Sequence, residues 1–407
     1  MGNTVYSAIV IGAGASGMMA AITAAGRGLS VLVLEQQKRP GKKLLATGNG
    51  RCNFTNEHLS GECYHGDSTL IAAVLEQFTL EDCLAFFHEI GVLPKKKRDC
   101  YYPNSGQAAS VADALAAELD RLGVTLVTEA CVTSVESARN GFICRTKERT
   151  YRGKNLLFAT GLLASPKLGS DGSAIPLIKK MGHRFSPVLP ALCGFYCEGM
   201  DFRRVSGVRC DARLTLAIDG QRVGDERGEL QLTDYGLSGI PMFQLSSVAV
   251  RGLYKKRMVQ IYIDFLPELE APALEAELSR RRRRQGEGDI SRMLNGLLHS
   301  KLVPVCAAAS GLSERRSTKS LSEDALHRLA SVCKAFPVTL LRAREMEYAQ
   351  VCTGGVHAKE VNPRTLESRL LPGLYFAGEL LDADGICGGY NLHWAWATGF
   401  VAGSSMK

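Results

Sequence analysis

A glycine-rich turn near the N-terminus holds the first residues whose spacing predicts chemistry. Gly12, Gly14 and Gly17 form a G-x-G-x-x-G pattern, with Ala15 and Ser16 between the last two glycines. In such a turn the first glycine permits a tight bend, the second lets the backbone approach a diphosphate, and the third lets a helix pack against a strand. The amides at the helix start, aided by the helix dipole, hold the phosphates. We therefore predict that these five residues bind a dinucleotide.

An acidic residue follows at the spacing that a dinucleotide site requires. Residues 6–11 (YSAIVI) and 29–35 (LSVLVLE) predict two buried parallel strands, and residues 16–28, rich in Ala, predict the helix between them. Glu35 ends the second strand, 21 positions after the second glycine, where a carboxylate binds a ribose hydroxyl. We assign Glu35 and its neighbour Gln36 to the nucleotide site. This unit alone suits NAD and FAD equally well.

The C-terminal segment favours FAD. Residues 374–377 predict a strand that runs into Gly378, after which Glu379 or Asp382 supplies an acid for the ribityl chain of a flavin. A helix over residues 392–402 follows. Its N-terminus offers backbone donors and a positive dipole to the pyrimidine edge of the ring, where negative charge develops on reduction. The candidates for this contact are Gly389, Tyr390, Asn391 and Leu392.

The most specific string in the sequence is a basic loop over residues 41–53, which reads GKKLLATGNGRCN and is followed by Thr55 and Asn56. Two further strings accompany it, TGGV at 353–356 and GGYN at 388–391. With these motifs the chain resembles the NAD(P)/FAD-dependent oxidoreductases of the aminoacetone oxidase and BaiN-type group. The resemblance extends over nearly the whole length. It implies FAD as the bound cofactor and NADH or NADPH as a transient electron donor.

The cations and open backbone of the basic loop suit a diphosphate or a reduced flavin, and an ordinary basic surface loop is the alternative. Cys52 invites a redox role, but no second cysteine is close in sequence, so a structural thiol is the preferred interpretation. By resemblance, Val132 lies where a strand backbone meets the adenine, and Gly161 lies in a second glycine turn. The loop residues assigned to the cofactor are Lys42, Lys43, Gly50, Arg51, Cys52 and Asn53.

The pattern of elements predicts an α/β protein with a discontinuous, Rossmann-like FAD-binding domain. We assign residues 1–190 and 345–407 to this domain, because the C-terminal segment again shows a strand that runs into glycine and is followed by a helix. Alternating, strand-like segments predict a β-rich substrate domain over residues 191–266 and 337–344. Charged segments with Leu and Ala at helical spacing predict a helical insert over residues 267–336.

Composition narrows the class of protein. The chain has 407 residues, 45% of them hydrophobic and 22% charged, which indicates a folded protein of two or three domains. The thirteen cysteines form no C-x-x-C pair, and none of the eight histidines has a ligand-like spacing, so we expect no metal. We also expect no membrane span and a reducing cytoplasmic location, and the sequence does not define the oligomeric state. The net charge of +8 falls partly in the run 280–284, where a solvated helix face explains it better than nucleic acid.

The leading functional prediction is an NAD(P)H-driven reductase of a conjugated C=C bond in a small apolar enone. The resemblance includes enzymes that act on 3-oxo-4-ene bile acids or steroids. One alternative is a flavin amine oxidase for an aminoacetone-like substrate, producing hydrogen peroxide. Another is a flavin-binding module in nucleic acid modification. No catalytic acid or base is assigned, and His393 and Tyr235 are only weak candidates, since packed side chains are commoner at such positions.

Overall fold

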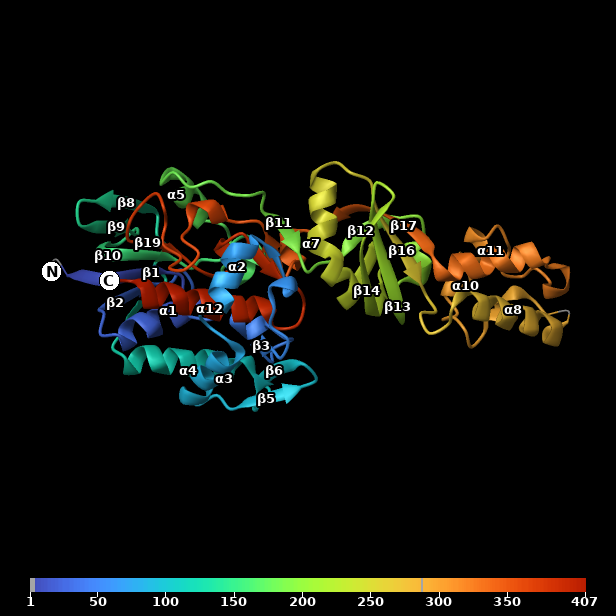
Figure 1. Ribbon diagram of the computed structural model, residues 1–407, viewed down its shortest axis with the longest axis horizontal. Coiled ribbons are helices and arrows are strands. Elements are labelled where there is room, and N and C mark those ends of the chain that lie inside the picture. Colours follow the sequence, from blue (N-terminus) through green and yellow to red (C-terminus); the bar gives the residue numbers. More distant parts are fainter. Residues whose placement is uncertain (1–3, 287) are drawn as a thin grey trace. The chain divides into compact units, whose positions relative to one another are not determined.

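The structure is a computed structural model that describes residues 4–286 and 288–407, and its chain forms two compact units (Figure 1). The first unit comprises residues 1–190 and 349–407, and the second comprises residues 191–348. The C-terminal part of the first unit thus begins four residues later than the expected 345. The β-rich and helical segments, expected as separate domains, fall within one unit.

A seven-stranded sheet forms the core of the first unit. In their order across the sheet the strands are β7 (Thr125–Val127), β2 (Val31–Leu34), β1 (Val5–Ile11), β10 (Thr150–Phe158), β9 (Gly141–Arg145) and β8 (Ser134–Ala138), with β19 (Leu374–Phe376) paired to β10. The strands from β7 to β10, together with β19, pair in parallel, and β9 and β8 pair antiparallel. Strand β2 is apolar and buried along its whole length, and β1 is buried from Ala8 to Ile11, as covered parallel strands are.

Helices and small sheets surround this core (Figure 1). The helices are α1 (Ala15–Gly26), α2 (Ser68–Leu75), α3 (Leu80–Glu89), α4 (Ala108–Arg121), α5 (Ala174–Lys180) and α12 (Tyr390–Ser405). The small sheets pair β3 (Thr55–Asn56) with β6 (Cys100–Pro103) and β5 (Pro94–Lys97), β4 (Tyr64–Gly66) with β20 (Ala383–Gly385), and β11 (Leu189–Ala191) with β18 (Val351–Thr353). Figure 1 shows α12, from the C-terminus, alongside α1, from the N-terminus.

A closed barrel forms the centre of the second unit. Its strands, in order around the barrel, are β12 (Phe195–Glu198), β15 (Gly236–Gly239), β14 (Gln221–Leu232), β13 (Arg209–Ile218), β16 (Val259–Asp264) and β17 (Phe336–Ala343). The helices of this unit are α6 (Phe202–Val205), α7 (Ile240–Tyr254), α8 (Ala271–Gln285), α9 (Ile290–Leu294), α10 (Leu302–Ala309) and α11 (Glu323–Lys334). Helix α7 lies within the segment that was expected to be β-rich.

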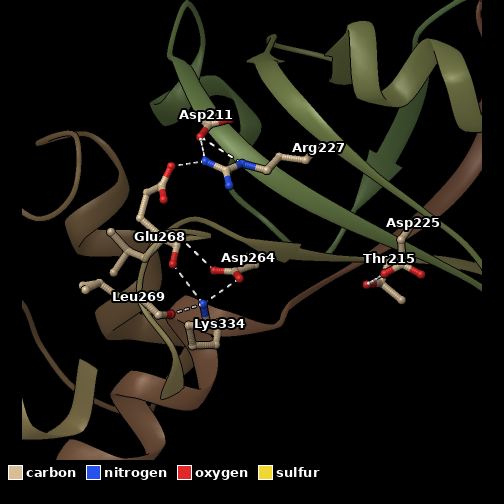
Figure 2. Close-up of polar contacts among 9 residues, drawn as sticks. Asp211, Thr215, Asp225, Arg227, Asp264, Glu268, Leu269 and Lys334 are labelled. Atoms are coloured by element: carbon tan, nitrogen blue, oxygen red, sulfur yellow. Dashed lines mark hydrogen bonds and ion pairs between the residues drawn. The ribbon is translucent and has the colours of Figure 1, made fainter. Parts of the chain in front are cut away.

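Charged contacts connect the barrel to the helical part of the second unit (Figure 2). Lys334, at the end of α11, lies 2.6 Å from a carboxylate oxygen of Asp264 at the end of β16. It also donates to the carbonyl oxygens of Leu266 and Leu269, at 2.9 and 2.5 Å. Because the Lys334 and Asp264 side chains are only 16% and 13% exposed, water screens this pair poorly. These contacts join the end of β16 and the loop after it to α11 within the second unit.

The segment over residues 68–90 forms two helices, because Thr79 begins α3 with a capping box that includes Asp82. One sequence expectation about local structure was wrong. Val132 was expected in a strand, but it lies in irregular backbone before β8, which begins at Ser134. Within the described ranges, every helix is too short or too polar to cross a bilayer.

Candidate functional site

The glycine turn lies between β1 and α1, as predicted, and the three glycines meet different surroundings. A Cβ atom on Gly12 would lie 2.6 Å from the Ala159 carbonyl oxygen, and one on Gly17 would lie 1.9 Å from the Gly12 oxygen. The fold itself therefore requires these two glycines. A Cβ on Gly14 would meet no atom within 4 Å. The open space beside Gly14 is where a dinucleotide backbone would approach the turn.

The start of α1 leaves backbone donors facing this space. Gly14 is the N-cap residue, and no side chain caps the helix. The hydrogen bond from Met18 N to Gly14 O, 3.0 Å long, is the first of the helical ladder. The amides of Ala15, Ser16 and Gly17 precede it and have no acceptor within the helix. The turn thus fits a diphosphate, whose oxygens would accept from these amides.

Glu35 is fixed beside the turn. Its Oε2 accepts from Ala13 N at 2.6 Å and its Oε1 accepts from Gln37 N at 2.8 Å. Burial raises the pKa of this carboxyl, and the hydrogen bonds from the Gln37 and Ala13 amides oppose that rise. The side chain of Gln36 points elsewhere and donates to Gly169 O at 2.7 Å. Glu35 is therefore held beside the glycine turn, and its binding of a ribose stays a prediction.

The basic loop and the C-terminal segment meet in one ion pair. Lys43 Nζ lies 2.9 Å from Glu379 Oε2, and Cys352 N donates to Glu379 Oε1 at 2.7 Å. The sequence suggested Lys43 and Glu379 as separate cofactor residues from opposite ends of the chain, and the structure brings them together. Lys42 Nζ donates to Gln37 Oε1 at 2.9 Å. Both lysines are therefore oriented by side chains of the same unit.

Three further loop residues differ in exposure. Arg51 is exposed, with its guanidinium carbon 5.6 Å from the centre of the Tyr102 ring. Cys52 is fully buried, and burial raises the pKa of its thiol to about 12, which favours the structural interpretation over a redox role. Asn53 Oδ1 is buried and has no hydrogen-bond partner in the described part of the chain. A buried acceptor without a donor is unfavourable, so Asn53 fits a ligand that supplies one.

The helix start at α12 also has the backbone that a flavin contact needs. Gly389 is its N-cap residue, with φ +98°, and a Cβ there would lie 2.7 Å from Thr55 O. Asn391 is used by the loop, since its amide pairs with Gly385 N and O at 2.9 and 2.6 Å. Asp382 accepts from the Ser186 hydroxyl. Tyr390 is buried.

The remaining candidates are dispersed. Gly161 has φ +67° and a Cβ there would lie 3.6 Å from Glu379 Oε2, so this turn adjoins the ion pair. Val132 is close to the nucleotide-binding strand through Ala130 N, which donates to Glu35 O at 2.9 Å. Leu392 follows the α12 start and is partly buried. No cluster of three or more His, Cys, Asp or Glu able to hold a metal occurs among the described residues.

The two weak catalytic candidates lie in different units. His393 is fully buried, with Nδ1 2.9 Å from Thr55 Oγ1 and Nε2 3.2 Å from Phe78 O. Because a carbonyl only accepts, Nε2 carries the proton, and Nδ1 accepts from Thr55. Burial lowers the pKa of His393 to about 4. His393 is therefore a neutral packed residue and not an acid or base. Tyr235 lies in the second unit, in the turn before β15.

The profile of a protein family, the HI0933-like protein Rossmann domain, matches residues 6–405. The chain belongs to this HI0933-like Rossmann family. It is 41% identical to a 3-dehydro-bile acid delta(4,6)-reductase of Clostridium scindens over 397 residues, or 97% of each chain. It is 29% identical to a ribosomal RNA dihydrouridine synthase of Escherichia coli over 98% of each chain. The predicted family and the predicted fold class are confirmed.

A solved structure agrees on the fold. The 3-ketosteroid delta1-dehydrogenase from Sterolibacterium denitrificans matches with a TM-score of 0.51 and 13% identity, over 99% of each chain. At that identity the likeness concerns the fold alone. Together with the open glycine turn and the buried Glu35, the family match supports FAD as the cofactor.

Proposed function

We propose that this protein is an FAD-dependent reductase that uses NADH or NADPH to reduce a conjugated C=C bond in an apolar enone, such as a 3-oxo-4-ene bile acid or steroid. The observation that carries the proposal is the 41% identity, over 97% of each chain, to a 3-dehydro-bile acid delta(4,6)-reductase. We place the reaction in the cytoplasm, since buried cysteines such as Cys52 and Cys83 occur as thiols and NAD(P)H is an intracellular reductant.

Different residues of the first unit would bind different parts of the cofactor. The α1 amides would bind the diphosphate, and Glu35 would bind the adenosine ribose. The N-terminus of α12 would direct a positive dipole at the pyrimidine edge of the ring, which stabilises the negative charge of the reduced state. The chemistry that FAD supplies when bound is hydride transfer between nicotinamide and substrate. The sequence contains only one dinucleotide turn, so we assign NAD(P)H a transient position over the flavin.

An anaerobic experiment tests the proposal. The purified FAD-loaded protein is mixed with NADH or NADPH, and loss of the oxidised flavin absorbance is followed. Androst-4-ene-3,17-dione is then added, and we expect absorbance to return with formation of the saturated ketone in equal amount. Flavin that is reduced by aminoacetone but by neither nicotinamide would instead establish the amine oxidase and refute the reductase.

RNA modification is the second candidate, because the chain is also 29% identical to a ribosomal RNA dihydrouridine synthase. Such an activity would again reduce a C=C bond conjugated to a carbonyl, with uracil as the substrate. The arginine run gives it little support: Arg281 donates to Met293 O and Asn295 O, and Arg282 donates to Leu321 O. Tight, steeply salt-dependent binding of ribosomal RNA, without enone turnover, would favour this candidate.

A further inference from the structure

Positive side chains gather on one face of the small sheet that β3, β6 and β5 form within the first unit. In the antiparallel pair of β5 and β6, Lys95 is opposite Tyr102 and Lys97 is opposite Cys100. Residues that are directly opposite in such a pair point to the same face, and every second residue of a strand returns to that face. These four side chains therefore share one face. The Arg51 guanidinium carbon lies 5.6 Å from the centre of the Tyr102 ring and joins them. We call Arg51, Lys95, Lys97 and Tyr102 the basic face.

The cations of the basic face have no acidic partner among the described residues. Arg51, Lys95 and Lys97 are exposed, and no described carboxylate forms an ion pair with them. The other face of the same strand differs, because Lys96 Nζ lies 3.1 Å from Glu57 Oε2. Like charges that share a surface repel one another, so an anion that lies among them is attracted by all three.

The basic face adjoins the loop that leads into α12. Cys100, which shares this face, donates from its Sγ to Gly388 O at 3.6 Å. Gly388 immediately precedes the N-cap residue of α12, whose start is proposed to face the flavin ring. Tyr102 and Lys95 lie two positions farther along the strands than Cys100, a distance of about 7 Å. An extended dinucleotide bound along this face would therefore have one end at the start of α12 and the other among the cations.

The side chains of the basic face suit one part of a nicotinamide dinucleotide. Arginine and lysine bind phosphate, and an arginine near the ribose accommodates the 2′-phosphate that distinguishes NADP from NAD. Tyr102 is partly buried and offers a flat ring on which a base can stack. A polynucleotide is held through more phosphate contacts than three cations supply. The adenosine 2′-phosphate of NADPH fits this face better than the 2′-hydroxyl of NADH, which brings no negative charge to it.

We propose that Arg51, Lys95 and Lys97 bind the 2′-phosphate of NADPH while its adenine lies against Tyr102. NADPH is then the preferred electron donor, and NADH is the weaker one. This inference rests on the proposed reductase function and deepens it by choosing between the two donors. Every residue that it uses belongs to the first unit. Because the three cations are exposed, the donor can bind and leave without a change in the fold.

Calorimetric titration of the FAD-loaded protein with two nucleotides measures this site without turnover. Adenosine 2′,5′-bisphosphate carries both phosphates of the adenosine half of NADPH, and 5′-AMP lacks the 2′-phosphate. The wild type should bind the bisphosphate at least about tenfold more tightly than 5′-AMP. Lys95→Gln and Lys97→Gln should each reduce this affinity ratio about three- to fivefold, as expected for exposed charges. Lys96→Gln is the matched control, because it removes the same charge from the other face of the same strand and should leave the ratio unchanged.

Two results would overturn the site. The first is equal affinity of the wild type for the two nucleotides, and the second is an equal effect of Lys95→Gln, Lys97→Gln and Lys96→Gln on the ratio. Either result, obtained with a protein that still reduces an enone, leaves the reductase intact. Lys95→Arg keeps the positive charge and should retain the wild-type ratio, which separates loss of charge from a disturbed strand. A protein that discriminates the nucleotides but whose flavin NADPH does not reduce refutes the reductase, and with it the role of the basic face in binding the donor.

Discussion

Replacement of Gly14 by alanine separates ligand binding from folding. The backbone at Gly14 has φ −80° and ψ −170°, which any residue adopts, and a Cβ there meets no protein atom within 4 Å. The change should therefore leave the free energy of unfolding within about 1 kcal/mol of wild type, since a small entropic gain opposes the weaker helix-capping of alanine. With the diphosphate in the open space, the methyl group displaces one charge-assisted hydrogen bond. The loss of roughly 1.5 to 3 kcal/mol lowers FAD affinity about 10- to 150-fold.

The assay measures FAD affinity and stability on the same protein. Flavin fluorescence titration of the apoprotein gives the Kd, and urea unfolding of the apoprotein gives the free energy of unfolding. Gly17→Ala is the matched control, because its Cβ would lie 1.9 Å from Gly12 O and the fold itself must yield. We expect that variant to be poorly folded. A Gly14→Ala protein that binds FAD as tightly as wild type, or that unfolds as readily as Gly17→Ala, would refute this account of the turn.

Three further predictions concern buried groups of the first unit. Glu35→Gln places an amide N–H where a carboxylate oxygen accepts from a backbone N–H, so it should weaken FAD binding about tenfold. The control Glu118→Gln, in an ion pair on α4, should leave FAD binding unchanged. Equal effects of the two changes would count against the ribose role of Glu35. Cys52, with its pKa raised to about 12, should resist iodoacetamide at pH 8 in the native protein while exposed Cys131 reacts, as peptide mass spectrometry would record. His393 has a folded-state pKa lowered from 6.5 to about 4, so unfolding takes up a proton between these values and stability should fall by roughly 3 kcal/mol as pH drops from 6.5 to 4. Urea unfolding of wild type and His393→Asn across this range checks it, and identical pH slopes would contradict it.

The strands and the glycine turn of the first unit could be predicted from the sequence, because their local residue patterns agree with the fold that they form. Residues 6–11 were expected as a strand, and β1 is Val5–Ile11. Buried parallel strands are short apolar runs, here followed by glycine, and this pattern can be recognised in one sequence without aligned relatives. The prediction that Gly14 faces a ligand rests on the same local rule.

Contacts between side chains that are far apart in the sequence could not be predicted from it. Nothing in the local pattern of Lys43 or Glu379 shows that the two meet, since 336 positions separate them. Nor does the periodicity of the 240–254 segment exclude a strand, although Ile240–Tyr254 is a helix that begins with a proline at its first turn.

The contact between the two chain ends explains why the site is built from a discontinuous domain. A Cβ on Gly399 of α12 would lie 2.4 Å from Ser16 O, and one on Gly403 would lie 2.5 Å from Ala20 O. The absence of side chains at these positions lets α12 approach α1 at backbone distance. Ser16 belongs to the glycine turn that is proposed to bind the diphosphate, and Gly389 is the N-cap of α12, which is proposed to face the flavin ring. If the cofactor binds as proposed, the close packing of the two helices would set the distance between its diphosphate end and its ring end.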